Sequence, residues 1–169
     1  EGWHPGVIGI AASKISEHFY RPCILISLQG DKGVGSARSI EGFNIYNALK
    51  QVDDLFIRFG GHEMAAGFSI PREAIPELKR RLLSYVHHSM DESLLIPRNY
   101  HDGVLMPQDI TLSLVQELRL LEPFGIGNPP PRFLFSNVQV ENCWTVGNDG
   151  RHLKMSVSTG QRLWDAIGF

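Results

Sequence analysis

The segment RFGGHEMAAGFSI, residues 58–70, places two adjacent glycines next to a histidine. Gly60 and Gly61 can adopt positive φ angles and let a bulky ligand approach the main chain. The N–H groups exposed in such a turn form a concavity for anions, which would be stronger if a helix began at Glu63. His62 could donate a hydrogen bond to a phosphate oxygen. The segment predicts a phosphate-binding turn, and the alternative is a tight strand–helix turn with a structural histidine.

A second candidate site lies in VGSARSI, residues 34–40, whose alternating pattern predicts a strand. On a strand, Ser36 and Arg38 would point to the same face. A hydroxyl and a guanidinium at this spacing could clamp a phosphodiester group. The alternative is a solvated edge strand.

The residues that could hold catalytic metal ions are scattered. Two-metal hydrolysis of a phosphodiester needs several Asp and His ligands that converge. The seven histidines show no Asp-His-His cluster, and no Asp-x-Asp pair occurs. His87 and His88, with Asp91 nearby, are the remaining metal candidates. The sequence contains no nucleophile elbow, the motif that would indicate Ser-His-Asp catalysis.

Composition places the chain among globular proteins. Its 169 residues are 43% hydrophobic and 20% charged, with a net charge of -2. Any nucleic-acid binding must therefore come from a local patch, because the global field is not basic. No apolar run is long enough to span a membrane. Cys23 and Cys143 form no Cys-x-x-Cys pair, which disfavours zinc and favours a reducing cytoplasm. The missing initiator Met and the apolar C-terminus are typical of a piece of a longer protein.

The elements that must position these residues fall into an α/β unit followed by a β-rich one. Helices are predicted at residues 7–20, 44–52 and 71–86, and strands at 23–28, 34–40 and 67–70. They define a first domain at 1–90 and a linker at 91–103. Residues 104–169 combine one helix, at 111–121, with several short strands joined by turns, which predicts a small β-barrel of the OB type.

Four segments together show a resemblance to a known family. GWHPGVIGIAASKI, GSARSIEGFNIYNAL, RFGGHEMAAGFSI and LEPFGIGNPPPRF resemble, in this order, the RecJ family of single-stranded-DNA-specific exonucleases in the DHH phosphoesterase superfamily. The resemblance implies that residues 1–90 are the DHH-associated substrate-binding domain and that 104–169 begin an OB-type domain. The family's Mn²⁺ or Mg²⁺ ligands would lie in an N-terminal domain outside this sequence, so no metal is expected on the chain itself.

The resemblance also assigns roles to individual residues. His62 would lie closest to the scissile phosphate and assist the metal site. The other positions would contact the substrate, and they are Lys14, Ser36, Arg38, Ser39, Arg58, Gly60 and Gly61. Lys14 takes a place where related sequences often carry Arg. In the β-rich domain, aromatic and basic residues could bind bases and phosphates, the alternative being a barrel core; they are Phe124, Phe133, Trp144, Arg151, Lys154 and Trp164.

The expected function is the substrate-binding part of a metal-dependent 5′→3′ single-stranded-DNA exonuclease in repair and recombination, inactive without the metal-binding domain. One alternative is a DHH phosphoesterase acting on short oligonucleotides or cyclic dinucleotides, and another is a non-catalytic protein-interaction module. The expected partners are single-stranded DNA and a single-strand-binding or other repair protein. A monomer in the bacterial cytoplasm, with no membrane association, is expected.

Overall fold

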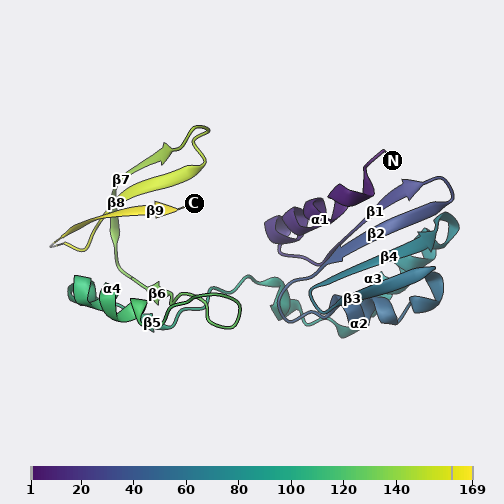
Figure 1. The fold of residues 1–169 in the computed structure, drawn as a ribbon, viewed down its shortest axis with the longest axis horizontal. Helices are drawn as coiled ribbons and strands as arrows, with labels where there is room; N and C mark the ends of the chain where they lie inside the picture. Colours follow the sequence, from purple (N-terminus) through teal and green to yellow (C-terminus); the bar gives the residue numbers. More distant parts are fainter. Residues whose placement is uncertain (1, 161, 169) are drawn as a thin grey trace. The chain divides into compact units, whose positions relative to one another are not determined.

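The computed structural model describes residues 2–160 and 162–168. They belong to two compact units, Glu1–Arg98 and Asn99–Phe169, which are described separately below (Figure 1). The division falls inside the linker predicted at 91–103, while the limits of the two domains stay a prediction. The expected order of an α/β unit followed by a β-rich unit is confirmed.

Unit 1 is built on a four-stranded antiparallel sheet with the order β1-β2-β4-β3. The strands are β1 (Cys23–Gln29), β2 (Lys32–Arg38), β3 (Arg58–His62) and β4 (Ala65–Pro71). The predicted strands at 23–28 and 67–70 are therefore confirmed, and the strand predicted at 34–40 is present but ends at Arg38. β1 and β3 are the edge strands, so one side of each has no ladder partner within the described sheet.

Helices cover the two faces of this sheet unequally. α1 (Pro5–Phe19) begins at His4, whose Nδ1 accepts the Gly6 N–H at 3.0 Å, and it packs on β1 and β2. α2 (Ile45–Lys50), capped by Asn44 as predicted, and α3 (Ile75–Ser89) cover the opposite face (Figure 1). That face carries the core, which contains Ala37, Leu49, Val52, Ala66, Phe68, Ile70 and Leu78.

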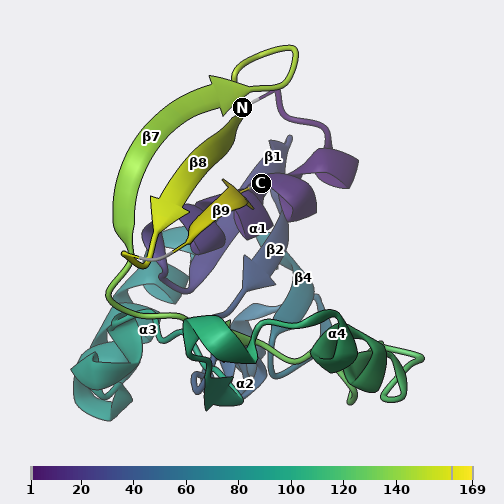
Figure 2. The same cartoon turned by 90° about the vertical axis from the view of Figure 1, so that its left-hand side faces the viewer.

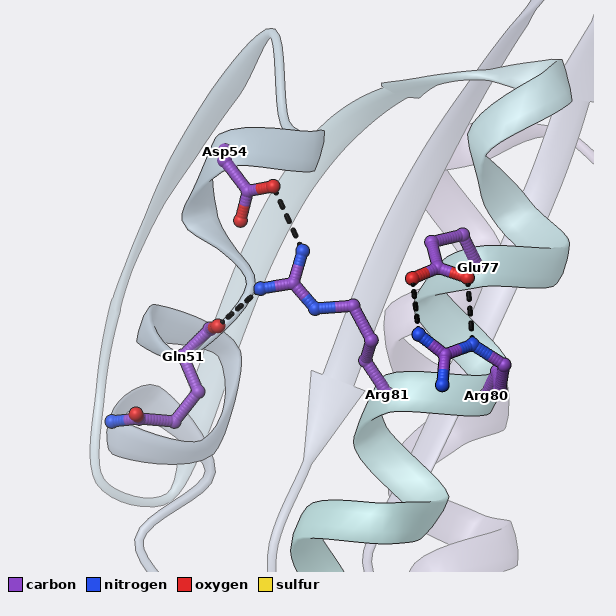
Figure 3. Close-up of polar contacts among 5 residues, drawn as sticks. All are labelled: Gln51, Asp54, Glu77, Arg80 and Arg81. Carbon is purple, nitrogen blue, oxygen red and sulfur yellow. Dashed lines mark hydrogen bonds and ion pairs between the residues drawn. The ribbon is translucent and has the colours of Figure 1, made fainter.

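An arginine of α3 fastens the short 3-10 helix Asp53–Leu55, which precedes β3. Arg81 Nη1 donates to Asp54 Oδ2 and Arg81 Nη2 donates to the Gln51 carbonyl, both at 2.8 Å (Figure 3). The hydrogen bond from Arg81 holds the pKa of Asp54 below its usual range. This contact fixes the chain at the entry to the edge strand β3.

The helix at Glu63 that would have strengthened the predicted anion-binding turn does not form. Residues 58–71 form a β-hairpin in which Glu63 and Met64 connect β3 to β4, and Gly60 and Gly61 lie in the strand. Alternation explains the difference, because Ala66 and Phe68 are buried in the core at a spacing of two. Burial of the β4 side chains thus overrides the helix propensity of Glu-Met-Ala-Ala, whose residues are all good helix formers.

Unit 2 contains two small sheets. β5 (Gly103–Val104) pairs in parallel with β6 (Phe133–Leu134), and α4 (Leu112–Arg119) lies between them in sequence, capped by Thr111. The other sheet is the antiparallel meander β7 (Gln139–Val146), β8 (His152–Ser158) and β9 (Leu163–Gly168). β7 is strongly curved (Figure 2), and its register with β8 shifts between Val140 and Asn142. The predicted succession of strands is confirmed.

Candidate functional site

The strand register brings the separate candidate motifs onto one face of the sheet of unit 1. Ser36 pairs with Gly67, and Gly67 pairs with Gly60. The next row, two residues along, joins Arg38 to His62 across β4. Residues directly opposite each other, and residues two apart on one strand, point to the same face. Two segments separated by more than twenty residues therefore present their polar groups on one face of the sheet, with β4 between them.

Only half of this face is covered. Within unit 1, α1 packs on β1 and β2, whereas the residues of β3 and β4 on this face are exposed or half-buried. We call this open part the β3–β4 platform. Its residues are Arg58, Gly60, His62 and Gly67, which are exposed, and Ala65 and Ser69, which are half-buried. Its centre is bare main chain, because the two glycines lie directly opposite each other.

Arg38 stands at the border between α1 and the β3–β4 platform. Its Nε donates to the Ser13 hydroxyl at 3.0 Å. Its Nη1 donates to the Ser36 hydroxyl at 3.0 Å and to the Ala37 carbonyl at 2.8 Å. Three hydrogen bonds thus fix a half-buried guanidinium, and the predicted pairing of Ser36 with Arg38 is a direct contact.

His62 ends the edge strand with an exposed ring. Its Nδ1 accepts the N–H of Met64 at 3.3 Å. A neutral ring that accepts at Nδ1 carries its proton on Nε2, so Nε2–H is available as a donor. The imidazole therefore offers a hydrogen-bond donor at the end of the β3–β4 platform.

The fold requires glycine at position 61 but not at position 60. Gly61 has a φ of 154°, and a β-carbon there would lie 2.4 Å from the Ala65 carbonyl oxygen and 2.5 Å from Ala66 Cα. Gly60 points to the opposite face, where an added β-carbon would meet no atom within 4 Å. Gly61 is thus needed by the hairpin, whereas the folded chain would tolerate a side chain at Gly60.

Three other predicted residues lie apart from the centre of the β3–β4 platform. Ser39 is buried, and its hydroxyl donates to the Phe43 carbonyl, so it supports the loop after β2 and does not face the platform. Lys14 is exposed on α1. Arg58 shares the platform face but lies at the far end of β3, paired with Ser69.

Sequence reasoning missed Gly9 and Ser13 of α1, which contact the Arg38 side chain. A signal was present, because glycine within a helix is unfavourable and requires a packing reason.

The candidates of unit 2 separate onto two faces of its meander. Trp144 pairs with Lys154, whose Nζ lies 5.6 Å from the indole centroid, and Trp144 is 40% exposed. Trp164 pairs with the buried Val157 on the other face. Arg162 lies 4.1 Å from the Trp164 ring centroid. Trp144 and Lys154 can therefore meet a ligand, while Trp164 belongs to the packed side.

The remaining candidates of unit 2 are Arg151, Phe133 and Phe124, and they offer fewer groups to a ligand. Arg151 pairs with Asp149 at 2.7 Å. Phe133 lies in β6, and Phe124 lies in the irregular segment before it.

A divalent metal ion finds no ligand set in the described part of the chain. Over residues 2–160 and 162–168, no group of three or more His, Cys, Asp or Glu side chains is arranged to hold a metal. His88 Nδ1 lies 2.7 Å from the Ser84 carbonyl of its own helix, and Asp91 caps the next turn through Ser93. The chemistry available is thus hydrogen bonding and charge neutralisation of an anionic ligand.

Comparison with known proteins assigns relatives to both units. Residues 1–88 match the family model of the DHHA1 domain, and residues 101–169 match that of the RecJ OB domain. The chain is 39% identical over 170 residues to the single-stranded-DNA-specific exonuclease RecJ of Bacillus subtilis (strain 168), covering 99% of this chain and 22% of the relative. It is 38% identical over 174 residues to that of Escherichia coli (strain K12), covering 99% and 30%.

Solved structures show the same likeness. The crystal structure of RecJ in complex with Mn²⁺ from Thermus thermophilus superposes with a TM-score of 0.75 at 33% identity, covering 98% of this chain and 24% of that one. The complex with Mg²⁺ from the same organism gives 0.71 at 28% identity, covering 97% and 30%. The chain spans between about a fifth and a third of the length of the relatives it matches.

Proposed function

The chain belongs to the DHHA1 domain family and continues into a RecJ OB domain, and from this membership we propose that it is the substrate-binding part of a metal-dependent single-stranded-DNA exonuclease. In the longer protein it would hold the strand during 5′→3′ degradation in repair and recombination. The observation that carries the proposal is the single sheet face shared by Ser36, Arg38, Gly60 and His62, which is covered by α1 at β2 and exposed at β3.

The β3–β4 platform suits a sugar-phosphate chain. The fixed guanidinium of Arg38 can donate to phosphate oxygens, and charge-assisted hydrogen bonds of this kind are among the stronger ones. His62 adds a donor at the platform's end, while Gly60 and Gly67 leave the main chain bare for close approach. These groups would position the strand and neutralise its charge, which are the contributions that a binding domain makes to catalysis.

Metal ions belong to a different part of the enzyme in this proposal. The solved RecJ structures contain Mn²⁺ or Mg²⁺, whereas the described residues of this chain offer no ligand set for such an ion. We therefore assign the metal to the longer protein. The chain alone, incubated with Mn²⁺ and single-stranded DNA, should release no nucleotides, and robust hydrolysis would refute this division.

Affinity for DNA tests the binding role directly. The 169-residue chain is titrated into a fluorescein-labelled oligodeoxythymidylate at several salt concentrations. Arg38→Ala should weaken binding about tenfold or more and reduce the salt slope by about 1, as expected for loss of one phosphate contact. Arg80→Ala is the matched control, since this exposed arginine pairs with Glu77 on α3, which covers the other face. Equal losses in both variants would contradict a specific site.

The length of the ligand separates this proposal from a phosphoesterase of dinucleotides. The RecJ OB domain match favours a long strand, and the Trp144–Lys154 face of unit 2 supplies a stacking platform with a cation beside it. We therefore expect affinity to rise steeply from a dinucleotide to a strand of about ten or more nucleotides. Affinity independent of length would favour the small-substrate alternative.

The setting we propose is the bacterial cytoplasm, with the chain as a monomer. Cys23 and Cys143 are both free thiols, which suits a reducing compartment. Among the described helices, none combines the length and apolar character that crossing a bilayer requires. Single-stranded DNA is the proposed main partner, and a single-strand-binding or other repair protein is the proposed protein partner.

A further inference from the structure

Two residues of α1, Gly9 and Ser13, lie against the guanidinium of Arg38. The Ser13 hydroxyl accepts from Arg38 Nε at 3.0 Å and donates to the Gly9 carbonyl at 3.2 Å. A β-carbon built on Gly9 would lie 2.9 Å from Arg38 Nη2 and 3.4 Å from the Ser36 hydroxyl. The arginine side chain is therefore held directly against the main chain of the helix.

The hydrogen bonds of Arg38 leave one nitrogen free. A guanidinium has five N–H donors in a planar fork. Three of them are used within the protein, by the Ser13 hydroxyl, the Ser36 hydroxyl and the Ala37 carbonyl. Among the described residues, no acceptor is assigned to the two N–H groups of Nη2, the nitrogen beside Gly9. Nη2 is thus the nitrogen of the guanidinium whose N–H donors are not used within the described part of the protein.

Glycine at position 9 needs an explanation, because it lies within the 15-residue helix α1. Glycine in a helix interior is unfavourable relative to alanine. The contact that requires it is visible, since the atom in the way of a side chain is the far end of Arg38. A flexible side chain can move aside, so alanine at this position would displace the guanidinium rather than unfold the unit.

We propose that Gly9 and Ser13 are positioning residues that hold the Arg38 guanidinium in place with Nη2 free for a phosphodiester oxygen. The inference rests on the proposed function, because it specifies how the phosphate-binding arginine is presented. A side chain that is fixed before binding loses less conformational freedom when the ligand arrives. The competing explanation is that Gly9 only allows α1 to pack closely on β2.

Binding of a fluorescein-labelled oligodeoxythymidylate to the 169-residue chain distinguishes the two explanations. Gly9→Ala should weaken binding about tenfold, the scale expected for a charged hydrogen bond, and Ser13→Ala should weaken it less. Ser13→Thr keeps the hydroxyl and should restore most of the affinity. Gly125→Ala, which adds a methyl group in open space, is the control and should bind like the parent chain.

Combining the substitutions tests whether Gly9 affects DNA binding through Arg38. If Gly9 acts through the guanidinium, Gly9→Ala/Arg38→Ala binds DNA no more weakly than Arg38→Ala alone. An equal loss from Gly9→Ala with and without Arg38 would overturn the proposal.

A second readout needs no DNA. The ¹⁵N–¹H resonance of Arg38 Nε should be protected from exchange by Ser13, lose that protection in Ser13→Ala, regain it in Ser13→Thr and shift in Gly9→Ala. An unchanged resonance in Ser13→Ala and Gly9→Ala overturns the positioning role whatever the affinity for DNA. If the resonance responds but Arg38→Ala binds DNA normally, the positioning is right and the proposed phosphate contact is wrong.

Discussion

A methyl group added at Gly61 should lower the stability of unit 1, whereas a methyl group added at the adjacent Gly60 should lower the affinity for DNA. Gly60→Ala and Gly61→Ala change the composition identically at neighbouring positions. Because consecutive residues of a strand point to opposite faces, one methyl group enters the β3–β4 platform and the other is directed at β4. The pair therefore separates the requirement of the fold from the requirement of the ligand.

Gly61→Ala should destabilise unit 1. Its β-carbon would lie 2.4 Å and 2.5 Å from main-chain atoms of β4, which cannot move without opening the hairpin. Overpacking costs about 1–3 kcal/mol, and a φ that side chains rarely adopt costs about 1–3 kcal/mol more. A loss of at least about 2 kcal/mol lowers the Tm of a domain of this size by about 10 °C or more.

Gly60→Ala should leave stability unchanged within about 1 kcal/mol, since the added methyl group meets open space. It would stand opposite Gly67, between Ser36 and the edge of the sheet. A phosphodiester chain lying across the bare main chain would have to move outward, so affinity for single-stranded DNA should fall about tenfold, equivalent to about 1.4 kcal/mol.

Far-UV circular dichroism during heating, together with titration of a labelled oligonucleotide, measures both quantities on the same samples. Unchanged melting of Gly61→Ala would show that the hairpin geometry is wrong. If Gly60→Ala binds DNA normally while Arg38→Ala binds it more weakly, the ligand does not cross the two glycines.

Two further outcomes are expected. Trp144→Ala should weaken DNA binding by about 1–3 kcal/mol without loss of stability. Trp164→Ala should instead destabilise unit 2, because Trp164 pairs with the buried Val157. DNA titrations and urea titrations of both variants check these two expectations. The pKa of Asp54 is lowered in the folded state by Arg81, so this contact stabilises above the unfolded carboxyl pKa of about 3.9 and is lost as pH falls through the lower folded value. The stability difference between the parent chain and Asp54→Asn should therefore shrink below about pH 4 in acid titrations of the Tm.

Much of unit 1 could be predicted because its elements carry local signals. Pro5 and His4 mark the start of α1, Asn44 caps α2, and the apolar run after Pro22 predicts β1. The hairpin at Glu63 could not be predicted in the same way. Glu-Met-Ala-Ala consists of good helix formers, and the strand conformation of β4 is decided by its pairing with β2 and β3, which periodicity over four residues cannot reveal.

Sequence spacing supports each motif of the candidate site separately, and the strand register shows how the motifs share one face. Spacing alone puts Ser36 and Arg38 on the same face of a strand, and the structure adds their contact at 3.0 Å. Nothing in the spacing places Gly60 in the same row as Ser36, because that depends on β4 lying between β2 and β3. Ser39 shows a limit of reasoning from sequence proximity, since it is adjacent to Arg38 on the chain but its hydroxyl is directed into the unit.

The strand order also explains why a bare surface is tolerated at this position. Paired glycines under a covering helix would leave an unfilled space, whereas Gly60 and Gly67 lie on the part of this face that is away from β1 and β2, where α1 packs. The core is built on the other face, where Ala66 and Phe68 pack against the layer of α2 and α3. Side chains can therefore be omitted from the β3–β4 platform without a cavity penalty. The same sheet thus serves stability through one face and, in our proposal, strand binding through the other.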